Sequence, residues 1–430
     1  MSPEIVGLIG ILLMLFFLFA RMWVAFAMAV VGFFGIVYLE GFARAFQIAG
    51  SAPYSFIAKY VFTTLPMFIL MGNIVYETGI ASDLFYAAHK WIGQQKGGLA
   101  MASAIASAIL GVVTDSLIAA ITLGRSAVAE MKKYNYDLSL ATSSVISGAS
   151  LASLIPPSVG FIIYGILTEQ SIGKLYIAGV IPGAILTGLI MLTIFSRVQI
   201  NPRLAPAGPK TSLKEKVASL KNVWAIGALT VFIIVGIYVG IFTPTEAGAV
   251  GSFGALVIGL IARRLTRKGF FNALIETGQM TAMVLLIMMG VSIFMKFMAI
   301  SKLPFMLGDV INQLAVSRYI IFAAIVLVYI ILGMVTDIIA SVILTTPILY
   351  PVIIALGFDP IWYGVVMVIM MEMGAITPPI GLNVFVFSSV VKVPMETIFR
   401  GIWPFCVAML LLVIIITIFP QLALWLPSTM

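Results

Sequence analysis

Long apolar stretches separated by short polar connections run along the whole chain. Many of these stretches reach about 20 residues, which is the length that a helix needs to cross the hydrocarbon core of a bilayer. Strand-like alternation of apolar and polar residues does not occur, so the pattern does not fit an outer-membrane barrel. The pattern predicts an all-α protein that crosses a membrane many times.

The first half of the chain is expected to hold five crossings and one re-entrant hairpin. The crossings are expected at residues 4–20, 24–39, 55–76, 139–167 and 175–197. Residues 98–131 are expected to enter and leave the membrane from one side, because Lys90 and Lys96 precede them and Lys132 and Lys133 follow them. The N-terminal segment has no Lys or Arg before its apolar run, so we interpret it as a membrane helix rather than a cleaved signal.

A short motif occurs twice. The residues GVVTD at Gly111–Asp115 return as GMVTD at Gly333–Asp337, 222 positions later. The same shift aligns Asp137 with Asp359, Pro156-Pro157 with Pro378-Pro379, and Gly179 and Pro182 with Gly401 and Pro404. Such agreement in one register predicts two homologous halves. The halves cover residues 1–208 (hairpin 98–131, broken helix 139–167) and 223–430 (hairpin 319–357, broken helix 361–390), with a cytoplasmic linker at 209–222.

The distribution of basic residues predicts the orientation of the two halves. Arg and Lys gather in segments 197–221 and 263–268, which the positive-inside rule places in the cytoplasm. Five crossings before the first of these segments put Met1 on the periplasmic side. An odd number of crossings inverts the second half relative to the first, so Met430 is expected on the periplasmic side as well.

Composition supports the membrane assignment and excludes several other classes. The 430 residues are 62% hydrophobic and 9% charged, with a mean hydropathy of +1.17, which is too little charge for the surface of a soluble protein. The net charge of +8 is typical of cytoplasmic loops and does not indicate nucleic-acid binding. Because Cys406 and His89 are the only cysteine and histidine, neither a disulfide framework nor a Cys/His metal centre is expected.

Each half is expected to contain two helix breaks inside the membrane. Lipid cannot satisfy the backbone groups that a break exposes, so breaks persist where they line a polar site. One break is the hairpin tip, and the other is the proline pair, since proline has no N–H to donate and ends the preceding helix. Free carbonyls and side-chain oxygens at these points suit Na⁺, while the helix N-termini beyond them suit an anion. The doubled motif therefore predicts two related half-sites of one transport site.

Several side chains near the breaks are candidates for this chemistry. Candidate cation ligands at the tips are Thr114, Asp115, Ser116, Thr336 and Asp337, and candidate contacts for an anionic substrate are Ser116, Arg125, Ser158 and Asn383. Other roles remain open, because Asp115 and Asn383 can cap helices and Arg125 can extend to the cytoplasmic face. Glu372 either braces the second break or carries a proton.

Three simpler or different interpretations are weaker. A single proline pair can be only a kink, but matched breaks in both halves favour a site. An intramembrane enzyme with Asp115 and Asp337 as a dyad would need no matched proline pairs, and no second acid–base system occurs. An ATP-driven permease would need a partner ATPase, because the chain has no GxxxxGK[ST] loop.

Four motifs together resemble the large membrane subunit of the tripartite ATP-independent periplasmic (TRAP) transporters. They are FTPTEAG at Phe242–Gly248, EMKKYNYD at Glu130–Asp137, LIPPS at Leu154–Ser158 and GAITPPIGLNVFV at Gly374–Val386. The resemblance covers essentially the whole chain and implies an elevator-type, Na⁺-driven importer of a small organic anion (a carboxylate, sugar acid or sulfonate) in the bacterial inner membrane. It also implies a small four-helix membrane subunit and a periplasmic substrate-binding protein as partners, with membrane lipid around them.

The resemblance implies two Na⁺ sites. Candidates for the first are Gly111, Val113, Thr114, Asp115, Ser116, Ala152, Ile155 and Pro156, and for the second Gly333, Thr336, Asp337, Gly374, Thr377 and Ile380. The first tip departs from the family pattern, since Val113-Thr114-Asp115-Ser116 stands where the family usually has Ser-Gly-Ser-Ser. Ala152 likewise replaces a usual glycine. The ligands of the first site and the identity of the substrate are therefore open.

Overall fold

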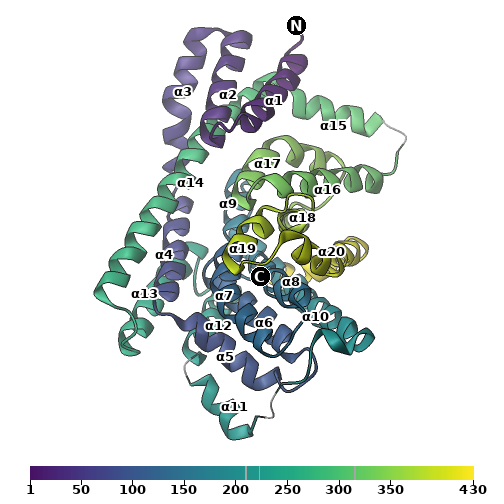
Figure 1. Cartoon of the computed structure of the whole chain (residues 1–430). Coiled ribbons are helices and arrows are strands. Elements are labelled where there is room, and N and C mark those ends of the chain that lie inside the picture. Colours follow the sequence, from purple (N-terminus) through teal and green to yellow (C-terminus); the bar gives the residue numbers. More distant parts are fainter. Residues whose placement is uncertain (209–210, 222, 314–315) are drawn as a thin grey trace.

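The computed structural model describes residues 1–208, 211–221, 223–313 and 316–430, and it is built from helices (Figure 1). Within those ranges no β-strand occurs, so the expected all-α class is confirmed. Six of the described helices are long and apolar enough to cross a bilayer, or eight spans if two bent helix pairs each count as one. The expected number of crossings stays a prediction, because several of the expected crossings correspond to apolar helices of only 10–17 residues.

The part of the chain before the linker folds into ten α-helices. Their bounds are α1 Pro3–Phe19, α2 Val24–Glu40, α3 Phe42–Ile57, α4 Thr64–Glu77, α5 Ile80–Ile92, α6 Gly98–Val113, α7 Ser116–Lys133, α8 Leu138–Ala149, α9 Val159–Thr168 and α10 Ile172–Ile200. Three short 3₁₀ turns, η1 Tyr60–Thr63, η2 Ser150–Ser153 and η3 Pro202–Leu204, complete it. The turn η2 lies at the first proline pair and so continues the broken helix toward its break.

The remaining helices repeat much of this order. Their bounds are α11 Leu213–Leu220, α12 Trp224–Tyr238, α13 Pro244–Ile261, α14 Arg267–Ser301, α15 Leu303–Gln313, α16 Arg318–Val335, α17 Ile338–Ala355, α18 Pro360–Ile376, α19 Leu382–Val391, α20 Met395–Ile418 and α21 Gln421–Ser428. The starts of α7 and α17 are 222 positions apart, and so are those of α8 and α18. The bonds Pro156-Pro157 and Pro378-Pro379 are both cis. Whether the two halves are inverted across a membrane stays a prediction.

In place of a single helix at residues 55–76, the structure has a bent pair of helices. α3 ends at Ile57 and α4 begins at Thr64, with a bend of 56° between them. Lys59 lies at the bend with an extended backbone and forms an ion pair with Glu169 at 3.0 Å. Because a charged side chain is stable only where it finds water or a partner, the chain turns at Lys59 instead of carrying it through an apolar span. In the second half α14 runs through 35 residues without a break.

The linker contains a helix that the sequence did not predict. α11 packs against α5, and Lys90 of α5 forms an ion pair with Glu215 of α11 at 3.3 Å. The Glu215 carboxylate, which accepts a hydrogen bond from Lys90, raises the pKa of the Lys90 ammonium. This polar contact holds the described part of the linker, residues 211–221, against the first half.

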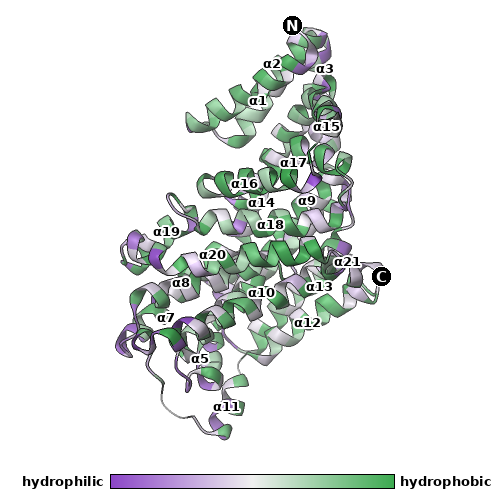
Figure 2. Ribbon diagram, turned by 90° about the vertical axis from the view of Figure 1, so that its right-hand side faces the viewer, coloured by the Kyte–Doolittle hydropathy of each residue, from purple (hydrophilic) through white to green (hydrophobic). Residues whose placement is uncertain are grey.

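The long helix α14 runs along one side of the molecule beside α2, α3 and α4 (Figure 1). The hairpins α6–α7 and α16–α17 and the broken helices α8–α9 and α18–α19 lie together on the other side (Figure 1). We call the first group the arm and the second group the hairpin body. Figure 2 shows apolar residues along most helices and hydrophilic residues gathered in the connections around α5, α7 and α11.

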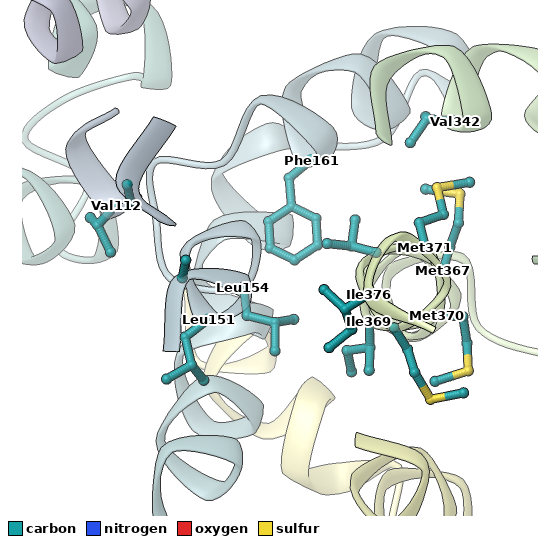
Figure 3. Close-up of a cluster of buried hydrophobic side chains, with 14 of the residues drawn as sticks. Val112, Leu151, Leu154, Phe161, Val342, Met367, Ile369, Met370, Met371 and Ile376 are labelled. Carbon is teal, nitrogen blue, oxygen red and sulfur yellow. The ribbon is translucent and has the colours of Figure 1, made fainter. Parts of the chain in front are cut away.

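Helix α18 lies at the centre of the hairpin body. Every residue from Ile361 to Ile376 is buried. Figure 3 shows side chains from both halves around it, including Leu151, Leu154, Phe161, Met367, Met370 and Met371. The methionine-rich run of α18 therefore fills the core, where flexible thioether side chains fit irregular gaps.

Close packing between the arm helices α2 and α14 predicts a stability effect. A Cβ added to Gly290 of α14 would lie 2.1 Å from the carbonyl oxygen of Ala25 in α2. Because that oxygen belongs to the backbone, it cannot move aside as a flexible side chain could. We expect Gly290→Val to lower the free energy of unfolding by about 1–3 kcal/mol, the usual cost of overpacking. Thermal unfolding in detergent measures this effect.

Gly278 provides the matched control on the same helix. A Cβ there would meet no atom within 4 Å, so Gly278→Val is expected to leave the unfolding temperature close to that of the parent. Equal unfolding temperatures for the two variants would contradict the close approach of α2 and α14.

Candidate functional site

The first hairpin tip lies between α6 and α7. The Asp115 carboxylate caps α7 and accepts a hydrogen bond from the Leu117 N–H at 2.9 Å. The Thr114 hydroxyl donates to the Leu110 carbonyl at 2.9 Å. A Cβ on Gly111 would lie 2.5 Å from the Cβ of Ala152, so the tip packs directly on the turn η2 of the first broken helix. Glycine at Gly111 permits this approach.

The second tip repeats this arrangement between α16 and α17. The Asp337 carboxylate caps α17 and accepts from the Ala340 N–H at 2.8 Å. The Thr336 hydroxyl donates to the Leu332 carbonyl at 2.8 Å. Both tip aspartates are therefore helix caps. Capping is one of the two roles that the sequence leaves open for Asp115, the other being cation binding. A cap uses one carboxylate oxygen, so capping leaves oxygen lone pairs for a cation.

A hydroxyl side chain flanks each proline pair, after the pair in the first half and before it in the second. The Ser158 hydroxyl follows the first proline pair and accepts from the Phe161 N–H at 3.4 Å, at the start of α9. Thr377 ends α18, and its hydroxyl donates to the Met373 carbonyl at 2.5 Å. A Cβ on Gly333 would lie 3.0 Å from the Cα of Gly374, so the second tip packs on the second break.

A small cavity of about 30 Å³ separates the first tip from the first break. It is lined by Gly111, Thr114, Asp115, Ser116, Ala152, Ser153, Pro157, Ser158, Val159, Gly160, Ile338 and Ile339. This volume holds one or two waters or an ion, because about 10–15 Å³ of such space admits one water. Six of the predicted residues therefore line one ion-sized space, and the hydroxyl and carboxylate oxygens among them are the ligands that hard cations prefer.

Two further cavities connect this region with the arm. The first, also about 30 Å³, lies beside Asp115, and the second has a volume of about 380 Å³. Both are lined by Asn73, Thr114, Ile118 and Met280, so they adjoin each other between α7 and the arm helices α4 and α14. The larger one is also lined by Tyr76, Ile121, Thr122, Glu276 and Gln279. We call the three cavities together the tip pathway.

The arm residues of the tip pathway were not predicted from the sequence. Asn73 and Thr277 are buried polar residues in apolar helices, and the Asn73 amide donates to the Thr277 hydroxyl at 3.0 Å. A polar residue inside an expected membrane helix is the signal that could have identified Asn73. Glu276 and Gln279 carry a weaker signal, because polar residues near the end of a long helix are common on a water-facing surface.

Several other predicted residues are not among those that line these cavities. Arg125 is exposed on α7, one turn beyond Thr122, and Ile380 is 47% exposed. Asn383 is buried in the first turn of α19 without capping it, so its capping interpretation is wrong. Ile155 and Pro156 lie in the break between η2 and α9. Val113 ends α6, and its side chain lies outside what the structure describes.

A carboxylate joins the two halves of the site. Glu372 of α18 is 1% exposed, and its Oε1 accepts a hydrogen bond from the Ser153 hydroxyl of η2. Its Oε2 has no hydrogen-bond partner among the described residues. Ser153 also lines the small cavity at the first tip. Glu372 therefore braces the first break from the second half, whereas the bracing interpretation places its contact at the second break.

Solved structures with this arrangement are membrane transporters. The structure of the YdaH transporter of Alcanivorax borkumensis matches all of this chain and 98% of that chain, with a TM-score of 0.66 and 14% sequence identity. At this identity the similarity establishes the fold alone.

Sequence comparison establishes the family. The chain matches the family described as "Tripartite ATP-independent periplasmic transporter, DctM component" over residues 11–422. It is 33% identical to the C4-dicarboxylate TRAP transporter large permease protein DctM of Pseudomonas aeruginosa, over 86% of each chain. It is 34% identical to the sialic acid TRAP transporter large permease protein SiaM of Vibrio cholerae, over 86% of this chain and 87% of the other. The chain belongs to the large membrane subunits of the TRAP transporters, and the expected resemblance is confirmed.

A third relative differs in length. The isethionate TRAP transporter permease protein DctMQ of Oleidesulfovibrio alaskensis is 30% identical over 88% of this chain, which spans 61% of that protein. The family and these relatives are transporters, so the expectation that the chain is a transporter subunit rather than an enzyme is confirmed.

The bond between Ser153 and Glu372 predicts a coupled effect on stability. Ser153→Ala would leave a buried carboxylate without its donor, so we expect it to lower the free energy of unfolding by about 1–3 kcal/mol. The loss should be smaller in a Glu372→Gln background, because a neutral amide costs less to bury than a charge. Thermal unfolding of the single and double variants measures the coupling.

Ser126→Ala is the control for the loss of a serine hydroxyl. The Ser126 hydroxyl donates only to the Leu123 carbonyl of its own helix, at 3.2 Å, on an exposed part of α7. If the loss in free energy of unfolding of the double variant equals the sum of the losses in the two single variants, Ser153 and Glu372 do not stabilise each other.

Proposed function

We propose that the chain imports a small organic acid across the bacterial inner membrane, driven by Na⁺, as the transport subunit of a tripartite system. The observation that carries the proposal is the ion-sized cavity where the first tip meets the first break, lined by the oxygens of Thr114, Asp115, Ser116 and Ser158. Discontinuous helices that meet in this way supply cation and anion sites in secondary transporters. The relatives support an organic acid, since their names specify C4-dicarboxylates, sialic acid and isethionate.

The second Na⁺ site is proposed at the second tip and break. Gly333 and Gly374 are in close contact there, and Thr377 supplies a buried hydroxyl beside the free carbonyls at the end of α18. Thr336 and Asp337 lie at the adjacent tip. The hydroxyl of Thr377 donates to the Met373 carbonyl and lies 3.5 Å from the Cys406 sulfur, so one of its oxygen lone pairs would remain for a cation.

The position of the tip pathway supports an elevator mechanism. The pathway lies between α7 of the hairpin body and α4 and α14 of the arm. A site on such a boundary is exposed to one side of the membrane or the other when one body slides past its neighbour. In this proposal the arm stays in place, and the hairpin body carries the ions and the substrate.

Two partners follow from membership of the family. A tripartite system combines this subunit with a small membrane subunit and a periplasmic binding protein, and the fused DctMQ relative is longer than this chain. We propose that the periplasmic protein delivers the acid and that a separate four-helix subunit supports the arm.

Proton coupling is the second candidate. Glu372 is the observation that favours it, because a buried carboxylate with one oxygen unpartnered among the described residues is neutralised by a bound proton. The ion-replacement experiment below separates the two candidates.

Replacement of Na⁺ by K⁺ at equal ionic strength is expected to abolish uptake. The assay uses proteoliposomes that contain the chain and its membrane partner, with the cognate binding protein outside. The labelled acids include C4-dicarboxylates, sialic acid, isethionate and their amino analogues. Undiminished uptake in K⁺ under a proton gradient would replace the Na⁺ proposal with the proton candidate.

Thr377→Val tests the second site within the same assay. Loss of one oxygen ligand is expected to raise the half-maximal Na⁺ concentration roughly tenfold or more, for a cost of about 1–3 kcal/mol. Thr193→Val is the matched control, since the Thr193 hydroxyl makes the same bond one turn back, to the Leu189 carbonyl at 2.7 Å, within α10. An unchanged Na⁺ dependence in Thr377→Val would remove this hydroxyl from the site.

Both termini are proposed to face the periplasm. Cysteine introduced at Ser2 or Thr429 is then expected to react with a membrane-impermeant reagent in spheroplasts that have not been permeabilised. The native background is low, because Cys406 is 3% exposed and is the only native cysteine. Reaction only after permeabilisation would contradict the proposed orientation of the two halves.

A further inference from the structure

The charges along the tip pathway are unusual for a site that receives an organic anion. Asp115 lines its inner end and Glu276 lines its outer cavity. Among the described residues, no Lys, Arg or His lines any of the three cavities. Glu276 makes no hydrogen bond or ion pair with another described residue, so its charge is not neutralised by the protein.

A dianion would meet like charges in this pathway. Repulsion between like charges is strong where water is scarce, because the effective dielectric is low. One Na⁺ in the tip cavity would offset one of these two negative charges, so the pathway would remain net negative. With or without that ion, the residues that line the pathway carry no net positive charge that would bind a substrate with two acid groups.

One cation stands near the outer end of the pathway. Arg125 follows Ile121 and Thr122 by four and three residues on α7, and both of those line the outer cavity. Side chains on a helix lean toward its N-terminus, so the guanidinium leans toward this cavity. Arg125 is exposed and forms no ion pair with another described residue. It is therefore available to an anionic group at the rim.

The helix α7 thus carries a negative charge beside the inner end of the pathway and a positive charge near its outer end. The carboxylate of Asp115 lies at the inner end, where the adjoining cavity of about 30 Å³ admits a group the size of an ammonium ion. The backbone of Arg125 lies ten residues further on, roughly 15 Å along the axis of an α-helix, and its long side chain shortens the distance to Asp115 by leaning toward the N-terminus. The outer cavity of about 380 Å³ between them is at the small end of the range for ligand pockets.

We propose that the substrate is a small zwitterion, an acid that also carries a protonated amine. Its ammonium group points toward Asp115 and its carboxylate or sulfonate points toward Arg125. The inference rests on the proposed function and specifies its substrate class. Such a molecule has no net charge, so it enters the pathway without the repulsion that a dianion meets.

Pairs of acids that differ only in the amine test the proposal. Taurine and isethionate share a sulfonate and a two-carbon chain and differ in an ammonium against a hydroxyl, and aspartate and malate differ in the same way. Binding of each is measured by isothermal titration to the purified membrane complex, without the binding protein, in Na⁺ buffer. We expect the amino member of at least one pair to bind tenfold or more tightly than its hydroxy analogue.

Two substitutions assign the preference to its residues. Asp115→Asn keeps a good helix cap and removes the charge, so it is expected to reduce the amine preference about tenfold. Arg125→Gln is expected to weaken both members of the pair. Asp137→Asn is the matched control, because Asp137 also caps a helix, through the Ser139 N–H at 2.9 Å, and lines none of the three cavities.

The outcomes separate this inference from the proposed function. Tighter binding of the hydroxy acids, no binding of either amino acid, or an amine preference that survives Asp115→Asn overturns the zwitterion assignment. Na⁺-dependent uptake of hydroxy acids or dicarboxylates would at the same time leave the proposed function intact. Loss of Na⁺ dependence with a preserved amine preference would overturn the coupling ion and keep the substrate class.

Discussion

Backbone groups inside a membrane have to find partners within the protein, and the architecture of the hairpin body depends on this requirement. The chain breaks its helices in both halves, and each break is enclosed by another part of the same chain. Asp115 and Asp337 satisfy N–H groups at the tips, while Ser158 does so after the first proline pair. Gly374 lets backbone approach backbone and Gly111 lets the first tip contact Ala152, so that protein rather than lipid surrounds the exposed carbonyls.

This enclosure explains how one residue serves structure and site together. A cap at a hairpin tip brings a carboxylate to the start of a helix, where the partial positive charge of the helix stabilises it. At Asp115 the same carboxylate also lines two cavities. The charge that the proposed site uses therefore lies where the fold already requires an acceptor, and its desolvation is offset by hydrogen bonding.

The sequence predicted those features that depend on local chemistry. The doubled tip motif and the two proline pairs identified the breaks, and Gly111, Thr114, Asp115, Ser116, Ala152 and Ser158 do line one cavity. The bend at Lys59 and the helix α11 were not predicted, because each depends on an ion pair with a residue distant in the sequence, Glu169 and Lys90 respectively. Asn73 and Glu276 were missed because only the tertiary fold, which places α4 and α14 across a cavity from α7, brings them beside the tip.

The bond from Glu372 to Ser153 has a consequence for how the two half-sites respond to ions. It ties helix α18, whose end forms the second break, to the turn η2 that forms the first. A cation that orders one break restricts the carboxylate, and through it the other break. The two sites then share a coupling free energy, which by thermodynamic linkage acts equally in both directions. If Na⁺ occupies both proposed sites, occupancy of the pair would rise cooperatively with ion concentration, over a narrower range of Na⁺ than for two independent sites.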